Sequence, residues 1–154
     1  MPNLQEGDIA PEISLPTEEG KPFNLSSLRG QNVVLYFYPK ADTPGCTTEA
    51  CSFRDSSQKF TAANTLIVGV SPDQSEAQAA FKSKFNLPFT LLADSEHKAA
   101  ELYGVWKEKN LYGHKSMGVE RTTFVINPDG VIKRIFPKVK VEGHTEAVLA
   151  AIQQ

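Results

Sequence analysis

The chain has few of the residues that specialised scaffolds require: its 154 residues include two cysteines, two methionines, one tryptophan and three histidines. Two cysteines are too few for a disulfide-rich scaffold. The histidines (His97, His114 and His144) have no metal-ligand spacing and are interpreted as surface residues, so we expect no metal and no cofactor. No apolar run approaches the ~20 residues of a membrane span, which argues against a membrane-spanning protein.

A strong charge of one sign is also missing. The net charge of −2 gives no electrostatic reason to expect binding to nucleic acid or to anionic membranes. Residues 1–6 lack a basic segment followed by an apolar run, so we expect no signal peptide and a cytoplasmic location. A length of 154 residues with 40% hydrophobic and 22% charged residues predicts one globular domain over residues 1–154 with its own apolar core.

Buried-strand and helical patterns alternate along the chain. We expect strands at residues 33–38, 66–70, 89–92, 122–126 and 131–136, and helices at 44–60, 75–85, about 95–104 and 143–154. The turn Asn127-Pro128-Asp129-Gly130 predicts an antiparallel hairpin, and residues 13–15 and 22–24 around Glu19-Gly20 predict a small N-terminal hairpin. Residues 107–118 are polar without a clear period and are interpreted as a loop.

This order of elements predicts an α/β fold in which a mixed central sheet is flanked by helices on both faces. The topology is thioredoxin-like, with an N-terminal β-hairpin extension and one insertion. In such a sheet the functional site lies beyond the carboxyl ends of the parallel strands. The strand ending at Tyr38 delivers the following turn to that edge.

Both cysteines follow this strand, within residues 38–51. Cys46 lies at the start of the predicted helix, for which Thr43 is the expected N-cap and Pro44 the first helical residue. A helix start offers free N–H groups and the positive end of the macrodipole, and both favour a thiolate over a thiol. Cys46 is therefore a candidate reactive cysteine.

Arg121 is the expected partner of Cys46. The strand that starts near Thr122 should run antiparallel to the strand ending at Tyr38, so its beginning lies at the same edge of the sheet. A guanidinium close to a thiol favours the thiolate, and its fork of donors also holds polar oxygens.

Pro39, Thr43 and Cys46 form a Pro-x-x-x-Thr-x-x-Cys pattern, through which the chain resembles the peroxiredoxins. Cys51, five positions after Cys46, is similar to the resolving cysteine of the PrxQ or bacterioferritin-comigratory-protein subgroup. The resemblance covers nearly the whole chain and includes residues 7–11, 25–30, 70–73, 87–89, 92–94 and 103–106, as well as Arg121 in the place of the family's active-site arginine.

The resemblance implies a peroxiredoxin domain of the AhpC/TSA type with thiol peroxidase activity. Cys46 attacks the peroxide, and Cys51 resolves the resulting sulfenic acid as an intramolecular Cys46–Cys51 disulfide. Thr43 and Arg121 stabilise the departing oxygen, and Pro39 shields the sulfur from water. Glu49 orients Arg121, the alternative being a solvated carboxylate on the helix face. Tyr38 lines the pocket, the alternative being a simple core residue.

The implied substrates are hydrogen peroxide and alkyl hydroperoxides, and the implied function is antioxidant defence. Thioredoxin is the expected reductant, with glutaredoxin as the alternative, and the subgroup resemblance implies a monomer. Cα atoms five residues apart in a regular helix are roughly 8.7 Å apart, whereas a disulfide needs about 4.4–6.8 Å. If Cys46 and Cys51 lie in one helix, their bond therefore requires local unwinding of its first turns.

Three other functions are weighed against this one. A thioredoxin-type disulfide reductase normally carries Cys-x-x-Cys, whereas the spacing here is Cys-x-x-x-x-Cys. A metal carrier would use both thiolates and a distant histidine, and a silent interaction module would keep the cysteines as a structural clip. Cys51 could also be a buried apolar filler, as free cysteines often are.

Overall fold

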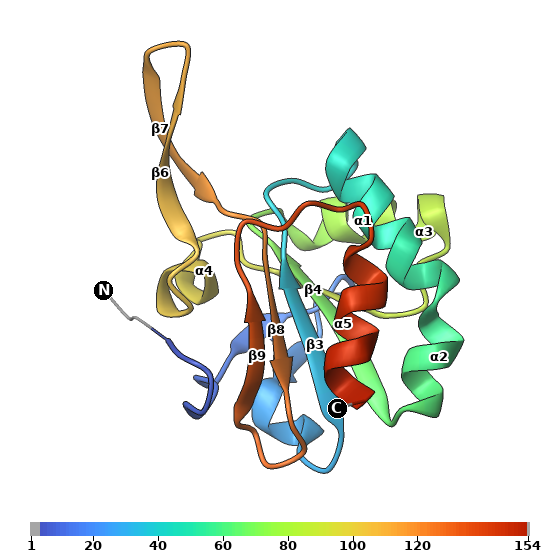
Figure 1. The fold of residues 1–154 in the computed structure, drawn as a ribbon. Helices are drawn as coiled ribbons and strands as arrows, with labels where there is room; N and C mark the ends of the chain where they lie inside the picture. The colour runs from blue at the N-terminus through green and yellow to red at the C-terminus, as the bar shows by residue number, and fades with distance from the viewer. Residues whose placement is uncertain (1–3, 154) are drawn as a thin grey trace.

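The computed structural model describes residues 4–153. A five-stranded sheet in the order β5-β4-β3-β8-β9 forms its centre (Figure 1). The strands are β3 (Asn32–Phe37), β4 (Thr65–Ser71), β5 (Thr90–Ala93), β8 (Thr122–Ile126) and β9 (Ile132–Phe136). β3, β4 and β5 run parallel, while β8 is antiparallel to both β3 and β9. The mixed sheet of the sequence-based prediction is confirmed.

Helices cover both faces of this sheet (Figure 1). They are α1 (Pro44–Asp55), α2 (Ser57–Ala62), α3 (Ser75–Phe85), α4 (Lys98–Leu102) and α5 (His144–Gln153), with a 3-10 turn η1 (Leu25–Leu28) near the start of the chain. The predicted N-terminal hairpin is also present, formed by β1 (Ser14–Pro16) and β2 (Pro22–Asn24). None of the helices in the described part of the chain has the length and hydrophobicity that crossing a bilayer requires.

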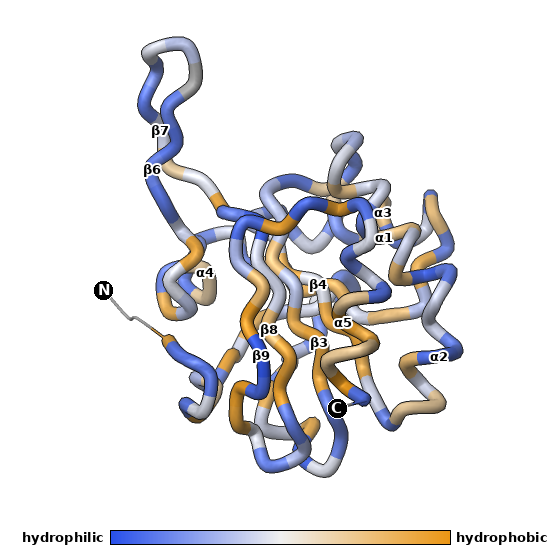
Figure 2. The backbone as a smooth tube through the Cα atoms, viewed as in Figure 1, coloured by the Kyte–Doolittle hydropathy of each residue, from blue (hydrophilic) through white to orange (hydrophobic). Residues whose placement is uncertain are grey.

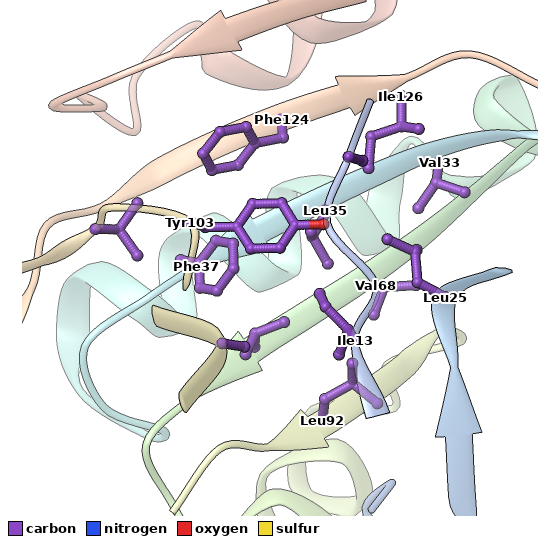
Figure 3. Close-up of a cluster of buried hydrophobic side chains, with 14 of the residues drawn as sticks. Ile13, Leu25, Val33, Leu35, Phe37, Val68, Leu92, Tyr103, Phe124 and Ile126 are labelled. Carbon is purple, nitrogen blue, oxygen red and sulfur yellow. The ribbon is translucent and has the colours of Figure 1, made fainter. Parts of the chain in front are cut away.

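The alternating side chains of β3 divide the core into two clusters. Leu35 and Phe37 face the cluster that contains Ile13 from the N-terminal segment and Tyr103 from the end of α4 (Figure 3). Tyr36 faces the other cluster, which α1, α2, α3 and α5 cover. The apolar strands run through the middle of the molecule, between more polar helix surfaces (Figure 2). A strand that is covered on both faces can be apolar along its length, as β3 is from Val33 to Phe37.

The prediction of a loop at residues 107–118 is wrong. β6 (Trp106–Leu111) and β7 (His114–Val119) form an antiparallel hairpin that projects from the body of the molecule (Figure 1). Its turn residues Tyr112 and Gly113 both have positive φ, 54° and 82°, as a two-residue type I′ turn requires. Most of β7 is exposed, and the hairpin is largely hydrophilic (Figure 2). Trp106 and Val119 at the base of the hairpin meet the core, but the exposed residues beyond them do not, so the sequence carries no alternation of apolar and polar residues there.

The single helix expected at residues 44–60 is also corrected. The structure divides it at Ser56, whose backbone (φ −104°, ψ 7°) leaves the helical region between α1 and α2. Asp55, Ser56 and Ser57 are modest helix formers whose side chains compete for backbone hydrogen bonds. Because the sequence has no proline or glycine at this position and the apolar pattern continues across it, the break between the helices cannot be recognised from the sequence. α1 is thereby a separate element of 12 residues.

Candidate active site

The site lies where β3 ends and α1 begins, at the carboxyl edge of the parallel strands. Residues 38–43 connect the two elements, and the loop includes Asp42 with a positive φ of 61°. α1 buries Cys46, Glu49, Ala50 and Phe53. Cys46 lies three and four residues before Glu49 and Ala50, and these lie four and three residues before Phe53, so all four share one helix face. Phe53 and Ala50 anchor this face in the core, and Cys46 and Glu49 extend it into the site.

Cys46 is the third residue of α1 and only 1% exposed. The N–H groups of the first helical turn have no acceptor within the helix. These free donors and the positive end of the helix dipole therefore lie at the same end of α1 as the sulfur. Thr43 occupies the N-cap position, as predicted, but its side chain makes no capping hydrogen bond. The Thr43 hydroxyl donates instead to the carbonyl of Lys40 at 2.7 Å, which folds the loop back on itself.

Arg121 connects the sulfur with a buried carboxylate. It directly precedes β8, and the register of β3 and β8 pairs Phe37 with Thr122. The Arg121 guanidinium donates through Nη2 to Cys46 Sγ at 3.3 Å and through Nη1 to Glu49 Oε1 at 2.7 Å. The antiparallel strand order therefore brings Arg121 against Cys46, as the topology predicted.

Glu49 is 1% exposed, so the alternative of a solvated carboxylate is wrong. Burial raises the pKa of Glu49 to about 7, against the opposing effect of the Arg121 charge. Burial also works to lower the pKa of Arg121, but the charges of Glu49 and Cys46 outweigh it and raise that pKa. The guanidinium consequently stays charged beside the sulfur, while the Glu49 carboxyl exchanges its proton near neutral pH.

The remaining residues of the predicted site lie around this pair. Tyr38 is fully buried in the same cluster as Cys46, and its hydroxyl donates to Gln78 Oε1 at 2.6 Å. Pro39 follows it at the start of the loop and is half-buried. Cys51 is half-buried and lies away from the buried face of α1. It lines a shallow surface depression together with Thr47, Thr48, Ser52, Asp55, Ser56 and Glu146.

Both cysteines are free thiols within one uninterrupted helix. Regular helical geometry holds their Cα atoms roughly 8.7 Å apart, too far for a disulfide. Among residues 4–153, no cluster of three or more His, Cys, Asp and Glu side chains is arranged to hold a metal ion.

The interpretation of His144 as a surface residue is wrong. Its side chain is 7% exposed at the start of α5, and its Nε2 lies 2.8 Å from the Thr123 hydroxyl. The ring meets Phe53 of α1 and Phe136 of β9 edge to face. Burial, together with the nearby Arg121 charge, lowers the pKa of His144 to about 4. A neutral histidine can pack against apolar side chains. The sequence around His144 does not show whether its side chain is buried or exposed.

Sequence reasoning also missed Asp73, which follows β4 at the same edge of the sheet. Its Oδ2 accepts the backbone N–H of Ala41 at 2.8 Å and the hydroxyl of Ser71 at 2.6 Å. The sequence carried a signal for this residue, since an aspartate shortly after a buried parallel strand lies at the edge of the sheet where the functional site is expected. Which loop it would hold depends on the placement of the strands.

The comparisons with known proteins all point to one family. Residues 7–135 match the AhpC/TSA family. A putative peroxiredoxin Bcp of Coxiella burnetii is 48% identical over 150 residues, covering 97% of this chain and 99% of the relative. Peroxiredoxin Bcp of Bacillus subtilis is 47% identical over 150 residues, covering 97% of this chain and 96% of the relative.

Solved structures show the same relationship. A cysteine-to-serine variant of Xylella fastidiosa PrxQ has a TM-score of 0.93 at 33% identity and covers 99% of this chain and 98% of its own. Peroxiredoxin Q of Xanthomonas campestris has a TM-score of 0.87 at 39% identity, covering 92% of this chain and 89% of its own.

Fold and site together define a thiol-dependent oxidoreductase on a thioredoxin-like scaffold, and the chain belongs to the AhpC/TSA family of peroxiredoxins. Within that family it is a member of the PrxQ, or Bcp, group, whose proteins are peroxidases.

Gly45 leaves the space that Arg121 occupies. A Cβ at this position would lie 3.1 Å from Arg121 Nη2. The guanidinium is held in place there by the bond from its Nη1 to Glu49. Because the φ of Gly45 is not positive, we expect Gly45→Ala to leave the free energy of unfolding unchanged or to raise it by up to ~1 kcal/mol. The guanidinium should move off the sulfur, so that the second-order rate with hydrogen peroxide falls by about 10-fold. Stopped-flow kinetics and urea unfolding measure the two effects.

The matched control is Gly118→Ala, in the projecting hairpin, where the nearest atom to the new Cβ is Lys109 Cδ at 3.4 Å. This variant should keep the wild-type rate. A Gly45→Ala protein as fast as wild type would contradict the close packing of Arg121.

His144 makes stability depend on pH. Its folded pKa of about 4 lies below the ordinary 6.5, so the unfolded chain binds more protons between these values. Stability should therefore be lost as the pH falls from 6.5 toward 4. We expect His144→Gln, which stays neutral, to remove about 2 kcal/mol of this loss after allowance for solvent screening.

The measurement is urea unfolding of both proteins at several pH values. Glu49 contributes in the opposite direction between pH 4.5 and about 7, but it is present in both proteins and cancels in the difference. Parallel pH curves for the two proteins would show that His144 does not titrate as a buried group.

Proposed function

We propose that this peroxiredoxin reduces hydrogen peroxide and alkyl hydroperoxides with Cys46 as the attacking residue. The observation that carries the proposal is the Arg121 guanidinium, 3.3 Å from the Cys46 sulfur at a helix start. A guanidinium is charged at every pH that the protein meets, and it stabilises the thiolate, which is the nucleophilic form. A guanidinium carries five N–H donors, and the bonds to Glu49 and Cys46 use two of them, so others can hold a peroxide oxygen.

In the proposed reaction the Cys46 thiolate attacks one peroxide oxygen in line with the O–O bond. The S–O bond forms as the O–O bond breaks, the sulfur is oxidised by two electrons to a sulfenic acid, and the departing oxygen leaves as water or alcohol after taking up a proton. Negative charge grows on that oxygen in the transition state. Arg121 and the free N–H groups at the start of α1 are placed to stabilise it.

The other site residues take supporting roles in this proposal. Glu49 holds Arg121 through its 2.7 Å ion pair and keeps the guanidinium over the sulfur. The Thr43 hydroxyl donates to Lys40, which leaves its oxygen free to accept the O–H of the incoming peroxide. Pro39 limits water at the mouth of the site, and Tyr38 forms part of the buried wall behind Cys46.

Cys51 is proposed as the resolving cysteine. Its thiol attacks the Cys46 sulfenic acid, an intramolecular disulfide forms and water is released. Because both residues lie in α1, this step requires the first turns of the helix to unwind. Unwinding also exposes the disulfide to a second protein.

A thioredoxin-type reductant would then restore both thiols by disulfide exchange. We infer thioredoxin itself, with glutaredoxin as the alternative. A monomer suffices for this cycle, since both cysteines belong to one helix. The low cysteine content suits the reducing cytoplasm.

The proposal is tested by turnover. We expect wild type to consume hydrogen peroxide with thioredoxin, thioredoxin reductase and NADPH, and Cys46→Ser to be inactive because the nucleophile is missing. Cys51→Ser should consume one equivalent of peroxide and then stop, because no disulfide forms for thioredoxin to reduce. Consumption of NADPH and titration of remaining peroxide report the two stages.

Disulfide reduction of insulin by the wild type, without peroxide consumption, would indicate a disulfide reductase instead. Normal turnover by Cys51→Ser would remove Cys51 from the mechanism and leave it as a filler residue.

Oxidation should loosen α1. We expect amide hydrogen exchange over residues 44–56 to be faster in the disulfide form than in the reduced form, because the first turns must open to join the sulfurs. The helices α3 and α5 serve as internal controls and should keep their protection. Equal protection of residues 44–56 in both forms would contradict the unwinding of the first turns.

A further inference from the structure

The loop that connects β3 to α1 is held from outside by a residue of another segment. Residues 38–43 carry Pro39 and Thr43 to the sulfur, and Asp73, between β4 and α3, accepts the N–H of Ala41 at 2.8 Å in the middle of this loop. The same Oδ2 accepts the Ser71 hydroxyl at 2.6 Å, so the carboxylate is itself fixed by its neighbour on the strand. Asp73 is half-buried, and its bond to Ala41 is charge-assisted.

The second contact on the loop is weaker. Lys84 of α3 pairs with Asp42 at 2.9 Å, but both side chains are largely exposed, at 59% and 46%. Exposed ion pairs of this kind contribute ~0–1 kcal/mol. Asp42 has a positive φ of 61°, a conformation that a non-glycine residue keeps only where its surroundings hold it. The start of the loop is held by the bond from the Tyr38 N–H to the Val70 carbonyl at 3.0 Å. Asp73 is therefore the main side-chain restraint on the middle of the loop.

The sulfur and the guanidinium are fixed independently of this loop. Cys46 is held by α1, which Phe53 anchors in the core, and Arg121 is held by β8 and by Glu49. The backbone of Thr43 is also held by α1, because its carbonyl accepts the N–H of Thr47 at 2.8 Å. Its hydroxyl, in contrast, is oriented by the loop through its 2.7 Å bond to Lys40. Displacement of the loop would turn the Thr43 hydroxyl and move Pro39, and would leave the Cys46–Arg121 pair in place.

We propose that Asp73 is a positioning residue for the peroxide: its hydrogen bond to Ala41 fixes residues 39–43 so that Thr43 meets the incoming peroxide O–H above Cys46. This inference rests on the proposed function. It separates two properties of the site. The general reactivity of the Cys46 thiolate depends on α1 and Arg121, whereas its reactivity with peroxide also depends on Asp73.

The test compares two reactions of the same sulfur. In a Cys51→Ser background, which leaves Cys46 as the only thiol, Asp73→Ala should slow the single-turnover reaction with hydrogen peroxide by about 10- to 100-fold, since small errors in alignment cost rates of this order. Alkylation of Cys46 by iodoacetamide, which needs the thiolate but no alignment of an O–O bond, should stay within about twofold of the parent. The ratio of the two rates is the measurement.

Two further variants serve as controls. Asp73→Asn keeps an acceptor oxygen for the Ala41 N–H and should recover most of the peroxide rate. Lys84→Ala removes the exposed ion pair with Asp42 and should remain close to the parent. Melting temperatures show whether each variant is folded.

An unchanged peroxide rate in Asp73→Ala would overturn the inference, and so would an equal loss in both reactions, because that pattern means general damage to the site. Asp73→Asn as slow as Asp73→Ala would overturn the hydrogen-bond account. If the parent protein itself failed to react with peroxide, while alkylation proceeded, the proposed function would fall before the role of Asp73 came into question.

Discussion

The positive charge of Arg121 must be balanced inside the protein, because the side chain is only 17% exposed and an unpaired buried charge is costly. Two groups of α1 provide that balance: the Glu49 carboxyl at 2.7 Å and the Cys46 sulfur at 3.3 Å. The guanidinium in turn gives the buried Glu49 carboxyl a charged partner inside the protein. The antiparallel pairing of β3 with β8 sets this contact, since it places the start of one strand beside the end of the other.

α1 serves two purposes that oppose each other in the proposed cycle. It must keep Cys46 buried and aligned for attack, and it must then release its first turns so that Cys51 can reach the oxidised sulfur. Ala50 and Phe53 hold the helix to the core, and the 2.6 Å bond between the Ser52 and Thr145 hydroxyls ties it to α5 just after Cys51. The break at Ser56 separates α1 from α2, so the first turns can open while α2 stays packed on β4.

Three segments that are distant in the sequence meet at one edge of the sheet. The loop after β3 carries Pro39 and Thr43, the segment after β4 contributes Asp73, and the residue before β8 is Arg121. Parallel strands end at a common edge and an antiparallel neighbour begins there, so three short loops can surround one sulfur. The strand and helix in this arrangement hold the charged groups, and the loop after β3 holds Pro39 and Thr43, which are proposed to meet the peroxide.

The sequence by itself determined the α/β class, the order of the central elements, the N-terminal hairpin and the place of Cys46 at a helix start, because apolar period, turn residues and helix-start residues are local signals. It also placed Arg121 near Cys46, once strand order was inferred. The hairpin β6–β7, the break at Ser56, the burial of Glu49 and His144 and the bond from Asp73 to Ala41 were decided only by the tertiary structure. Exposed strands have no apolar period, and the burial of a charged or titratable side chain depends on partners that lie far away in the chain.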